Sequence, residues 1–200
     1  MRQLALGISP PPEPSLDNFV PGQNAELLAR LRDLKAGRLA ESILYIWGEA
    51  GSGRSHLLQA CARSDLAIAD DVETLDERGQ IELFNRINAA REASTAVLAA
   101  GNAPPAQLRL REDLKSRLAW GLVYHVKALS DAERSLYLVA EAERRGMRLA
   151  DDVVSYLLVR VRRDLASLGS ILDALDRASL EQKRHLTVPL VRDVLKTLDE

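Results

Sequence analysis

The residues best suited to chemistry form a glycine-rich loop, Gly48-Glu49-Ala50-Gly51-Ser52-Gly53-Arg54-Ser55. Its spacing is that of a phosphate-binding loop, with Arg54 where such loops usually carry lysine. The glycines let successive backbone N–H groups face an anion at the start of a helix. Ser55 is placed to contact Mg²⁺, and Arg54 to reach the terminal phosphates. Because guanidinium is a wide planar fork and not a compact point charge, the replacement favours nucleotide binding without efficient hydrolysis. A ligand-free strand-to-helix turn is the alternative.

Polar side chains also follow two short apolar segments further along the chain. Leu66–Ala69 leads directly into Asp70 and Asp71, and a segment ending at residue 100 is followed by Gly101 and Asn102. Beside a phosphate loop, such a pair of acids suits Mg²⁺ binding by Asp70 and positioning of the attacking water by Asp71. Asn102 is placed to contact a γ-phosphate or that water. Acids after a strand and asparagine before prolines are also ordinary turn residues, so these assignments depend on the loop.

The elements that position these residues alternate between strands and helices. Apolar runs predict strands near 42–47, 66–69, 95–100 and 122–126. Helical periodicity predicts helices over 23–36, 54–63, 76–92 and 112–118, the third with Ile81, Phe84 and Ile87 facing inward. This alternation predicts an α/β core with a parallel sheet and with its ligand at the carboxyl ends of the strands.

The pattern becomes helical from Ser130 onward. Ser130-Asp131-Ala132-Glu133 is a capping-box sequence that starts a helix ending at Gly146, and further helices are predicted to residue 198. We therefore predict a core over 16–129 and a small all-α lid domain over 130–200. Residues 1–8 form a short apolar tip, and the proline-rich linker 9–15 is a stiff, extended spacer. Such a tip suits capture by a partner, with a frayed terminus as the alternative.

Composition excludes several classes of protein. The chain has 200 residues, of which 46% are hydrophobic, so a buried core is expected, and its net charge of −2 provides no general attraction to nucleic acid. The single cysteine, Cys61, rules out an internal disulfide, and with three histidines no structural zinc cluster is available. No apolar run approaches the ~18 residues of a membrane helix, and no secretory signal is evident, so a cytoplasmic location is expected.

The chain resembles the DnaA replication-initiator family of AAA+ proteins, and within it most closely the Hda group, the regulatory inactivators of DnaA. The segments that carry the resemblance are LDNFV (16–20), GEAGSGRSHLL (48–58), GNAPP (101–105), LKSRLAWGL (114–122) and LDALDRAS (172–179). The resemblance extends over essentially the whole chain and implies an AAA+ core followed by a helical lid. It also implies a site for ADP or ATP with Mg²⁺, formed by Phe19, Val20, Gly48, Glu49, Ala50, Gly51, Ser52, Gly53, Arg54, Ser55 and His56.

The resemblance further implies a regulatory role. Gln3, Leu4 and Leu6 are similar to the motif by which the Hda group binds the DNA polymerase sliding clamp. Arg117 matches the arginine finger of the family, which acts on the nucleotide of a neighbouring subunit. The implied function is an ADP-bound inhibitor of initiation that promotes hydrolysis of DnaA-bound ATP, without efficient turnover of its own. Self-association and contact with duplex DNA through the clamp are also expected.

Three departures from the family pattern accompany the resemblance. The chain ends at Glu200, after the lid and without the C-terminal DNA-binding helices of DnaA, which favours a regulator over an initiator. Ala166 stands where the family has a nucleotide-sensing arginine, so either Arg162 or Arg163 replaces it or nucleotide sensing is lost. The family also has another strand and helix before Leu66, so the sheet is expected to be one strand–helix unit short, at an edge. Either the chain is a shortened variant of reduced stability, or a segment has been lost from it.

Two other functions stay open at this stage. The chain could be a motor, a DnaA-like or helicase-loader-like ATPase, which steady-state turnover of the purified protein would reveal. It could also be a scaffold that binds the clamp but no nucleotide, which absence of nucleotide-dependent thermal stabilisation would reveal.

Overall fold

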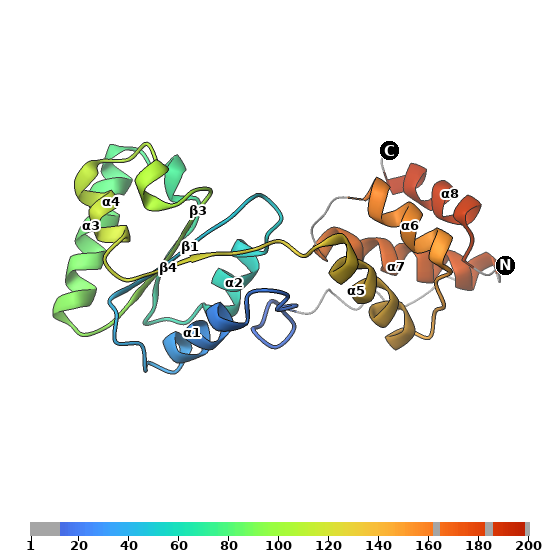
Figure 1. Ribbon diagram of the computed structural model, residues 1–200, viewed down its shortest axis with the longest axis horizontal. Helices are drawn as coiled ribbons and strands as arrows, with labels where there is room; N and C mark the ends of the chain where they lie inside the picture. The colour runs from blue at the N-terminus through green and yellow to red at the C-terminus, as the bar shows by residue number, and fades with distance from the viewer. Residues whose placement is uncertain (1–12, 162–164, 183–185, 199–200) are drawn as a thin grey trace. The chain divides into compact units, whose positions relative to one another are not determined.

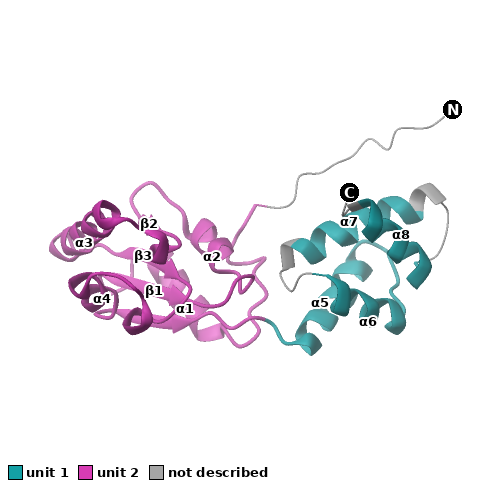
Figure 2. Cartoon of the chain, turned by 90° about the horizontal axis from the view of Figure 1, so that it is seen from above, with its two compact units in different colours: residues 1–11, 129–200 teal, residues 12–128 magenta. Residues whose placement is uncertain are grey.

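The computed structural model describes residues 13–161, 165–182 and 186–198. The described residues belong to two compact units, one formed by residues 13–128 and the other by the described residues from Leu129 onward (Figure 2). The proposed clamp-binding residues Gln3, Leu4 and Leu6 lie outside the described residues, as do Arg162 and Arg163.

The first unit is an α/β core built around a parallel sheet. Its strands are β1 (Ile43–Trp47), β2 (Ala67–Ala69), β3 (Val97–Gly101) and β4 (Leu122–His125). They pair in the order β2-β3-β1-β4, each pair parallel. Its helices are α1 (Ala25–Lys35), α2 (Arg54–Cys61), α3 (Glu77–Glu92) and α4 (Glu112–Leu118), with short 3-10 turns η1 (Val72–Thr74) and η2 (Pro105–Gln107). The predicted fold class is confirmed.

Two layers of helices cover the sheet, one on each face (Figure 1). Leu44 and Ile46 point from β1 into the cluster formed with α1 and α2. Ile43 and Tyr45 point into the opposite cluster, formed with α3 and α4. Because β1 is buried on both faces, its sequence is a continuous apolar run and not an alternating one. This burial holds the carboxyl end of β1, where the glycine-rich loop begins, in a fixed position.

The shortened connection after α2 places β2 at an edge of the sheet. The chain leaves α2 at Cys61 and enters β2 at Ala67, which pairs with β3 and not with β1. Arg63 fastens this connection, since it pairs with Asp65 and donates to the carbonyl of Lys35, each at 2.5 Å. The edge strand β2 has only three residues. A short edge strand limits pairing with foreign strands.

One detail of α3 differs from the sequence-based prediction. Ile81 is 40% exposed, whereas Leu83, Ile87 and Ala90 are buried. At 3.6 residues per turn these three residues form one stripe facing the sheet, and Ile81 falls outside it. Phe84 is half-buried and packs against the same cluster.

The secondary structure described in the second unit consists of helices: α5 (Asp131–Arg144), α6 (Asp151–Arg160), α7 (Leu165–Gln182) and α8 (Val188–Leu198). The predicted capping box is present, because Ser130 Oγ accepts from the Glu133 N–H and Glu133 accepts from the Ser130 N–H. Leu138, Leu157, Leu172 and Val191 are among the residues of its core. Over the described ranges, none of the helices has the length and apolar character that a bilayer span requires.

Candidate functional site

The glycine-rich loop connects the end of β1 to the start of α2, and two of its glycines are required by close contacts. A Cβ on Gly48 would lie 2.6 Å from the carbonyl oxygen of Val126 and 2.8 Å from Ser52 Oγ. Gly53 has a φ of +96°, in the left-handed region, and a Cβ there would lie 2.7 Å from the Phe19 ring. The loop therefore packs tightly against its surroundings, in a backbone conformation that favours glycine.

The start of α2 offers hydrogen-bond donors without protein partners. Gly53 is the N-cap of this helix and supplies no side-chain hydrogen bond. The N–H groups of its first turn consequently have no partner within the helix. Among the described residues, Ser52 Oγ and Arg54 Nη1 are also buried without a hydrogen-bond partner. Buried polar groups are rarely left unpaired, and these donors together fit a phosphate group.

Ser55 and Asp70 meet beside the loop. The Ser55 hydroxyl donates to Asp70 Oδ2 at 2.8 Å, joining the start of α2 to the residue after β2. A hydroxyl and a carboxylate are hard oxygen ligands, and Mg²⁺ at nucleotide sites typically takes one or two protein ligands together with phosphate and water. The described residues contain no cluster of three or more His, Cys, Asp or Glu side chains suited to a metal. The pair therefore fits a Mg²⁺ ion carried in with a nucleotide, and not a free-standing metal site.

Asp71 turns away from the extended path of β2 and faces Arg54. Its φ of 45° and ψ of 49° are left-handed, and its N–H donates to Asp70 Oδ1 at 2.9 Å. Arg54 Nη2 lies 3.7 Å from Asp71 Oδ1, an ion pair between the loop and the second acid. The predicted water-positioning residue is thus paired with the predicted phosphate-binding residue.

Asn102 follows the carboxyl end of β3, at the same end of the strands as the glycine-rich loop. Gly101, directly before it, accepts a hydrogen bond from the Gly48 N–H at 3.3 Å. The Asn102 N–H donates to Glu73 at 3.2 Å, while the residue itself is exposed. Sequence reasoning missed Glu73, which no motif marks. Burial, and to a smaller extent the charge of Glu73, raises the pKa of Tyr45. The Tyr45 hydroxyl donates to Ala103 O at 2.7 Å.

Phe19 and His56, both predicted to contact nucleotide, pack against each other. Their ring centroids are 5.6 Å apart, and His56 Nε2 lies 3.0 Å from the carbonyl oxygen of Ser15. Phe19 is 8% exposed, and its neighbour Val20 is half-buried. These contacts brace the segment before α1 against the loop and the start of α2.

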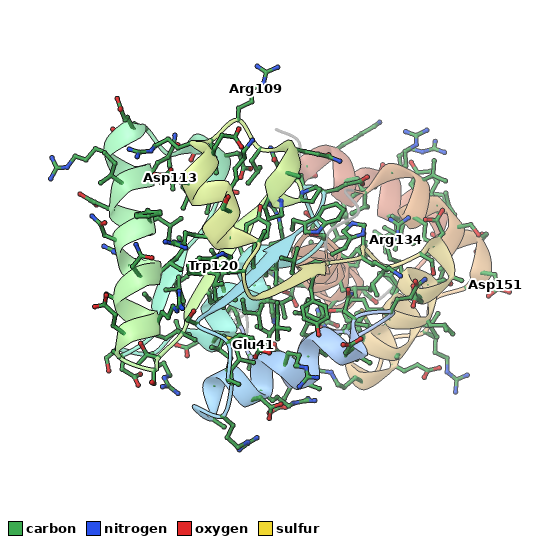
Figure 3. The ribbon with its side chains drawn as sticks, turned by 60° about the vertical axis from the view of Figure 1, so that its left-hand side comes forward. Glu41, Arg109, Asp113, Trp120, Arg134 and Asp151 are labelled. Atoms are coloured by element: carbon green, nitrogen blue, oxygen red, sulfur yellow. The ribbon has the colours of Figure 1, made fainter. Side chains whose placement is uncertain are left out.

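Arg117 lies apart from the loop. It stands at the end of α4, just before β4 starts, whereas the loop follows the carboxyl end of β1, which is parallel to β4. Its guanidinium lies 3.5 Å from the Trp120 ring centroid and 5.1 Å from that of Phe84. A hollow of about 560 Å³ is lined by residues that include Glu41 and Trp120. Figure 3 labels both of these side chains. The structure therefore places Arg117 near the amino ends of the strands, whereas the phosphate loop of the same chain lies at their carboxyl ends.

Asn24 is a second residue that sequence reasoning missed. It is 3% exposed, and its side-chain amide donates to Lys127 O and accepts from Lys127 N–H, both at 2.8 Å. This pair of bonds ties the start of α1 to the residues after β4, close to the boundary between the units. An asparagine before a helix is ordinary in sequence, so no local signal identifies this contact. Ala166, at the expected position of the lid arginine, falls within α7.

A glycine-rich loop between β1 and α2, acids directly after β2, a four-stranded parallel sheet and a following helical unit are features of the AAA+ fold. Residues 131–195, nearly all of the helical unit, match the family model described as "Hda, lid domain". The lid match, over about a third of the chain, and the DnaA-like fold of the core are consistent with a DnaA/Hda-type AAA+ protein, as the resemblance in the sequence predicts.

Solved structures share this fold. Domain III of the replication initiation protein DnaA from Thermotoga maritima has a TM-score of 0.72 and 20% identity, with 94% of this chain and 97% of that chain covered. DnaA bound to AMPPCP and single-stranded DNA has a TM-score of 0.72 and 22% identity, with 86% and 68% covered. AMPPCP-bound DnaA from Aquifex aeolicus has a TM-score of 0.70 and 22% identity, with 82% and 65% covered. At these identities the similarity concerns the fold.

Proposed function

We propose that this chain is a nucleotide-binding regulator of replication initiation that acts on DnaA. The observation that carries the proposal is the match of its helical unit to the Hda lid. The regulator would bind the DNA polymerase sliding clamp and promote hydrolysis of DnaA-bound ATP. Its own nucleotide, ADP or ATP with Mg²⁺, would serve assembly and not a motor cycle.

The donors at the start of α2 support nucleotide binding. The first-turn N–H groups, Ser52 Oγ and Arg54 Nη1 would hold the phosphates, and Ser55 with Asp70 would hold Mg²⁺. Two of the solved DnaA structures with the same fold contain AMPPCP. A bound nucleotide would supply an anion to donors that otherwise stay unpaired, and so would stabilise the core.

The surroundings of Arg117 support a role in trans. None of the ion pairs among the described residues includes Arg117, so aromatic rings and not a carboxylate hold its guanidinium. A guanidinium with an uncompensated charge can neutralise phosphate charge that develops on a neighbouring subunit. Such an arginine finger contributes about 10³ to 10⁵ in rate.

The nucleotide can be tested on protein purified without added ligand. We expect mass spectrometry of the denatured protein to find ADP or ATP, and added ADP with Mg²⁺ to raise the melting temperature. At 100 times its dissociation constant, a ligand adds about 2.7 kcal/mol of stability. If the protein retains no nucleotide and ADP does not shift its melting temperature, the chain is a clamp-binding scaffold. Rapid ATP turnover without partners would instead identify a motor.

The action on DnaA can be tested with labelled ATP preloaded on DnaA and with clamp loaded on DNA. The chain should accelerate conversion to ADP, and Arg117→Ala should remove the acceleration while leaving clamp and nucleotide binding intact. Arg111→Ala is the matched control, because Arg111 directly precedes the same helix and pairs with Asp113. Equal acceleration by Arg117→Ala would refute the role in trans.

Clamp binding is predicted from the sequence of the tip. Alanine at both Gln3 and Leu6 should abolish binding to immobilised clamp without changing the melting temperature. Ser9→Ala, in the adjoining linker, is the control. Retained binding by the double variant would place the clamp contact elsewhere.

A further inference from the structure

We propose that the ion pair between Arg54 and Asp71 restrains ATP hydrolysis by this chain itself. The inference rests on the proposed nucleotide site and assigns different roles to the two terminal nitrogens of the Arg54 guanidinium. One nitrogen of Arg54 binds phosphate, while the other keeps the Asp71 carboxylate away from the attacking water. The site would then hold a nucleotide with little turnover.

The two terminal nitrogens of Arg54 have different surroundings. Nη2 lies 3.7 Å from Asp71 Oδ1, whereas Nη1 is buried and without a hydrogen-bond partner among the described residues. The Arg54 side chain is 12% exposed and that of Asp71 is 56% exposed. A planar guanidinium can serve two acceptors in fixed directions at once, whereas a lysine ammonium is a single point charge. Arginine at this loop position therefore links the phosphate site to Asp71 in a way that lysine would not.

The backbone of Asp71 is held on both sides, which limits where its carboxylate can go. Its N–H donates to Asp70 Oδ1 at 2.9 Å. Its carbonyl oxygen accepts from the N–H of Thr74 at 2.9 Å and from the Thr74 hydroxyl at 2.8 Å. With the backbone held left-handed at this residue, the carboxylate approaches Arg54 without any rearrangement of the main chain.

Hydrolysis of ATP needs a carboxylate in a different role. The water oxygen bonds to the γ-phosphorus as the bond from that phosphorus to the bridging oxygen breaks, and ADP leaves with the electron pair. The proton of the water passes to a carboxylate or to solvent, so the products are ADP, phosphate and a proton. The water-positioning residue must accept a hydrogen bond from this water. While Asp71 pairs with Arg54, its oxygen is drawn toward the guanidinium and is a poorer acceptor.

The test uses the full chain and four proteins: wild type, Arg54→Lys, Asp71→Asn and the double variant. Asparagine adopts the left-handed conformation as readily as aspartate, so Asp71→Asn keeps the turn. Single-turnover hydrolysis of radiolabelled ATP should be about tenfold faster in Arg54→Lys than in wild type, and Asp71→Asn should remove this gain. Arg63→Lys is the matched control, since Arg63 also pairs with an aspartate of the core, and its rate should equal that of wild type.

A second readout does not depend on hydrolysis. Dissociation constants of a fluorescent ADP are measured for the same four proteins as a double-mutant cycle. If Arg54 bridges Asp71 and phosphate, the effect of Asp71→Asn should differ by about threefold or more between the wild-type background and the Arg54→Lys background. Additive effects, with no gain in rate from Arg54→Lys, would overturn the restraint while leaving the nucleotide site standing. Failure of all four proteins to bind ADP or ATP would overturn the nucleotide site and the restraint with it.

Discussion

The guanidinium of Arg117 stacks on the indole of Trp120, 3.5 Å from the ring centroid. Arg91 approaches the same ring at 4.8 Å. In the described part of the chain, Arg117 Nε is buried without a hydrogen-bond partner, so the contact with the rings is what holds this side chain. Arg54 differs, because its charge is balanced by Asp71. One arginine is thus paired with a carboxylate of the same chain, whereas the other rests on aromatic rings.

Trp120→Ala should weaken the action of Arg117 on a partner. A cation–π contact contributes about 0.5 to 2 kcal/mol, so if it orients Arg117, its loss should slow stimulated hydrolysis of DnaA-bound ATP about 2- to 30-fold. Trp120→Phe should restore part of the rate, since it retains a ring. Affinity for DnaA, measured separately, should change less than the rate. A variant with full stimulation would show that Trp120 does not position Arg117.

Ser55→Ala should uncouple nucleotide binding from Mg²⁺. The hydroxyl that bonds Asp70 at 2.8 Å is also the predicted ligand of the ion. We expect Mg²⁺ to tighten ADP binding by the wild type and to have little effect on the variant, as measured by calorimetry with and without EDTA. Ser116→Ala, on α4, is the control, because its hydroxyl only bonds the Glu112 carbonyl. If Mg²⁺ affects ADP binding equally in both variants, Ser55 is not a ligand of the ion.

Alanine at two glycines should have opposite effects on stability. Gly53→Ala meets the Phe19 ring and a left-handed backbone, which alone costs about 1 to 2 kcal/mol. Gly169→Ala lies within α7 with nothing within 4 Å of the new Cβ, and should stabilise its unit by about 0.5 to 1 kcal/mol. Chemical denaturation followed by circular dichroism measures both changes. A neutral Gly53→Ala would contradict the tight packing of the loop.

Cys61 should report the opening of α2. It is completely buried, and burial raises the pKa of its thiol to about 11. At pH 8 about 0.1% of such a thiol is ionised, so native protein should react slowly with a thiol reagent and denatured protein quickly. Added ADP should slow the reaction further by holding the loop that precedes α2. Labelling as fast in native as in denatured protein would contradict this burial.

The raised pKa of this thiol also sets a direction for stability. Folding favours the protonated thiol. The contribution of this thiol to the free energy of unfolding is therefore complete below the pKa of the unfolded thiol, about 8.5, and is lost as the pH rises through about 11. Cys61→Ala should lack this alkaline component in denaturation curves recorded between these pH values, although it will be less stable overall. An unchanged alkaline slope would assign the effect to other groups.

Local sequence patterns predicted most of the elements because their causes are local. The capping box at Ser130 and Glu133 depends on residues three positions apart, and the structure contains it as predicted. The helix over Glu112–Leu118 and the four strands were likewise evident from periodicity and apolar runs. The error at Ile81 has a tertiary cause, because the sheet selects which stripe of α3 is buried.

The candidate site was predicted as a set of residue types, and the fold added their partners. The loop, the two acids and Asn102 all follow the carboxyl ends of strands. Because the strands are parallel, these residues lie at the same end of the sheet. The pairing of Arg54 with Asp71, the tie between Asn24 and Lys127 and the contact between Phe19 and Gly53 have no counterpart in any short motif.

The residues alone were sufficient to establish an α/β core with a glycine-rich loop, a helical unit after it and the chemistry each side chain could perform. Strand order and packing then determined that Arg54 is balanced by Asp71 while Arg117 rests on Trp120 without a carboxylate. The physical reason is the distance along the chain over which each interaction acts. Helix caps, periodicity and glycine turns depend on neighbours within a few positions, whereas the environment of a charge depends on segments that only the folded sheet brings together.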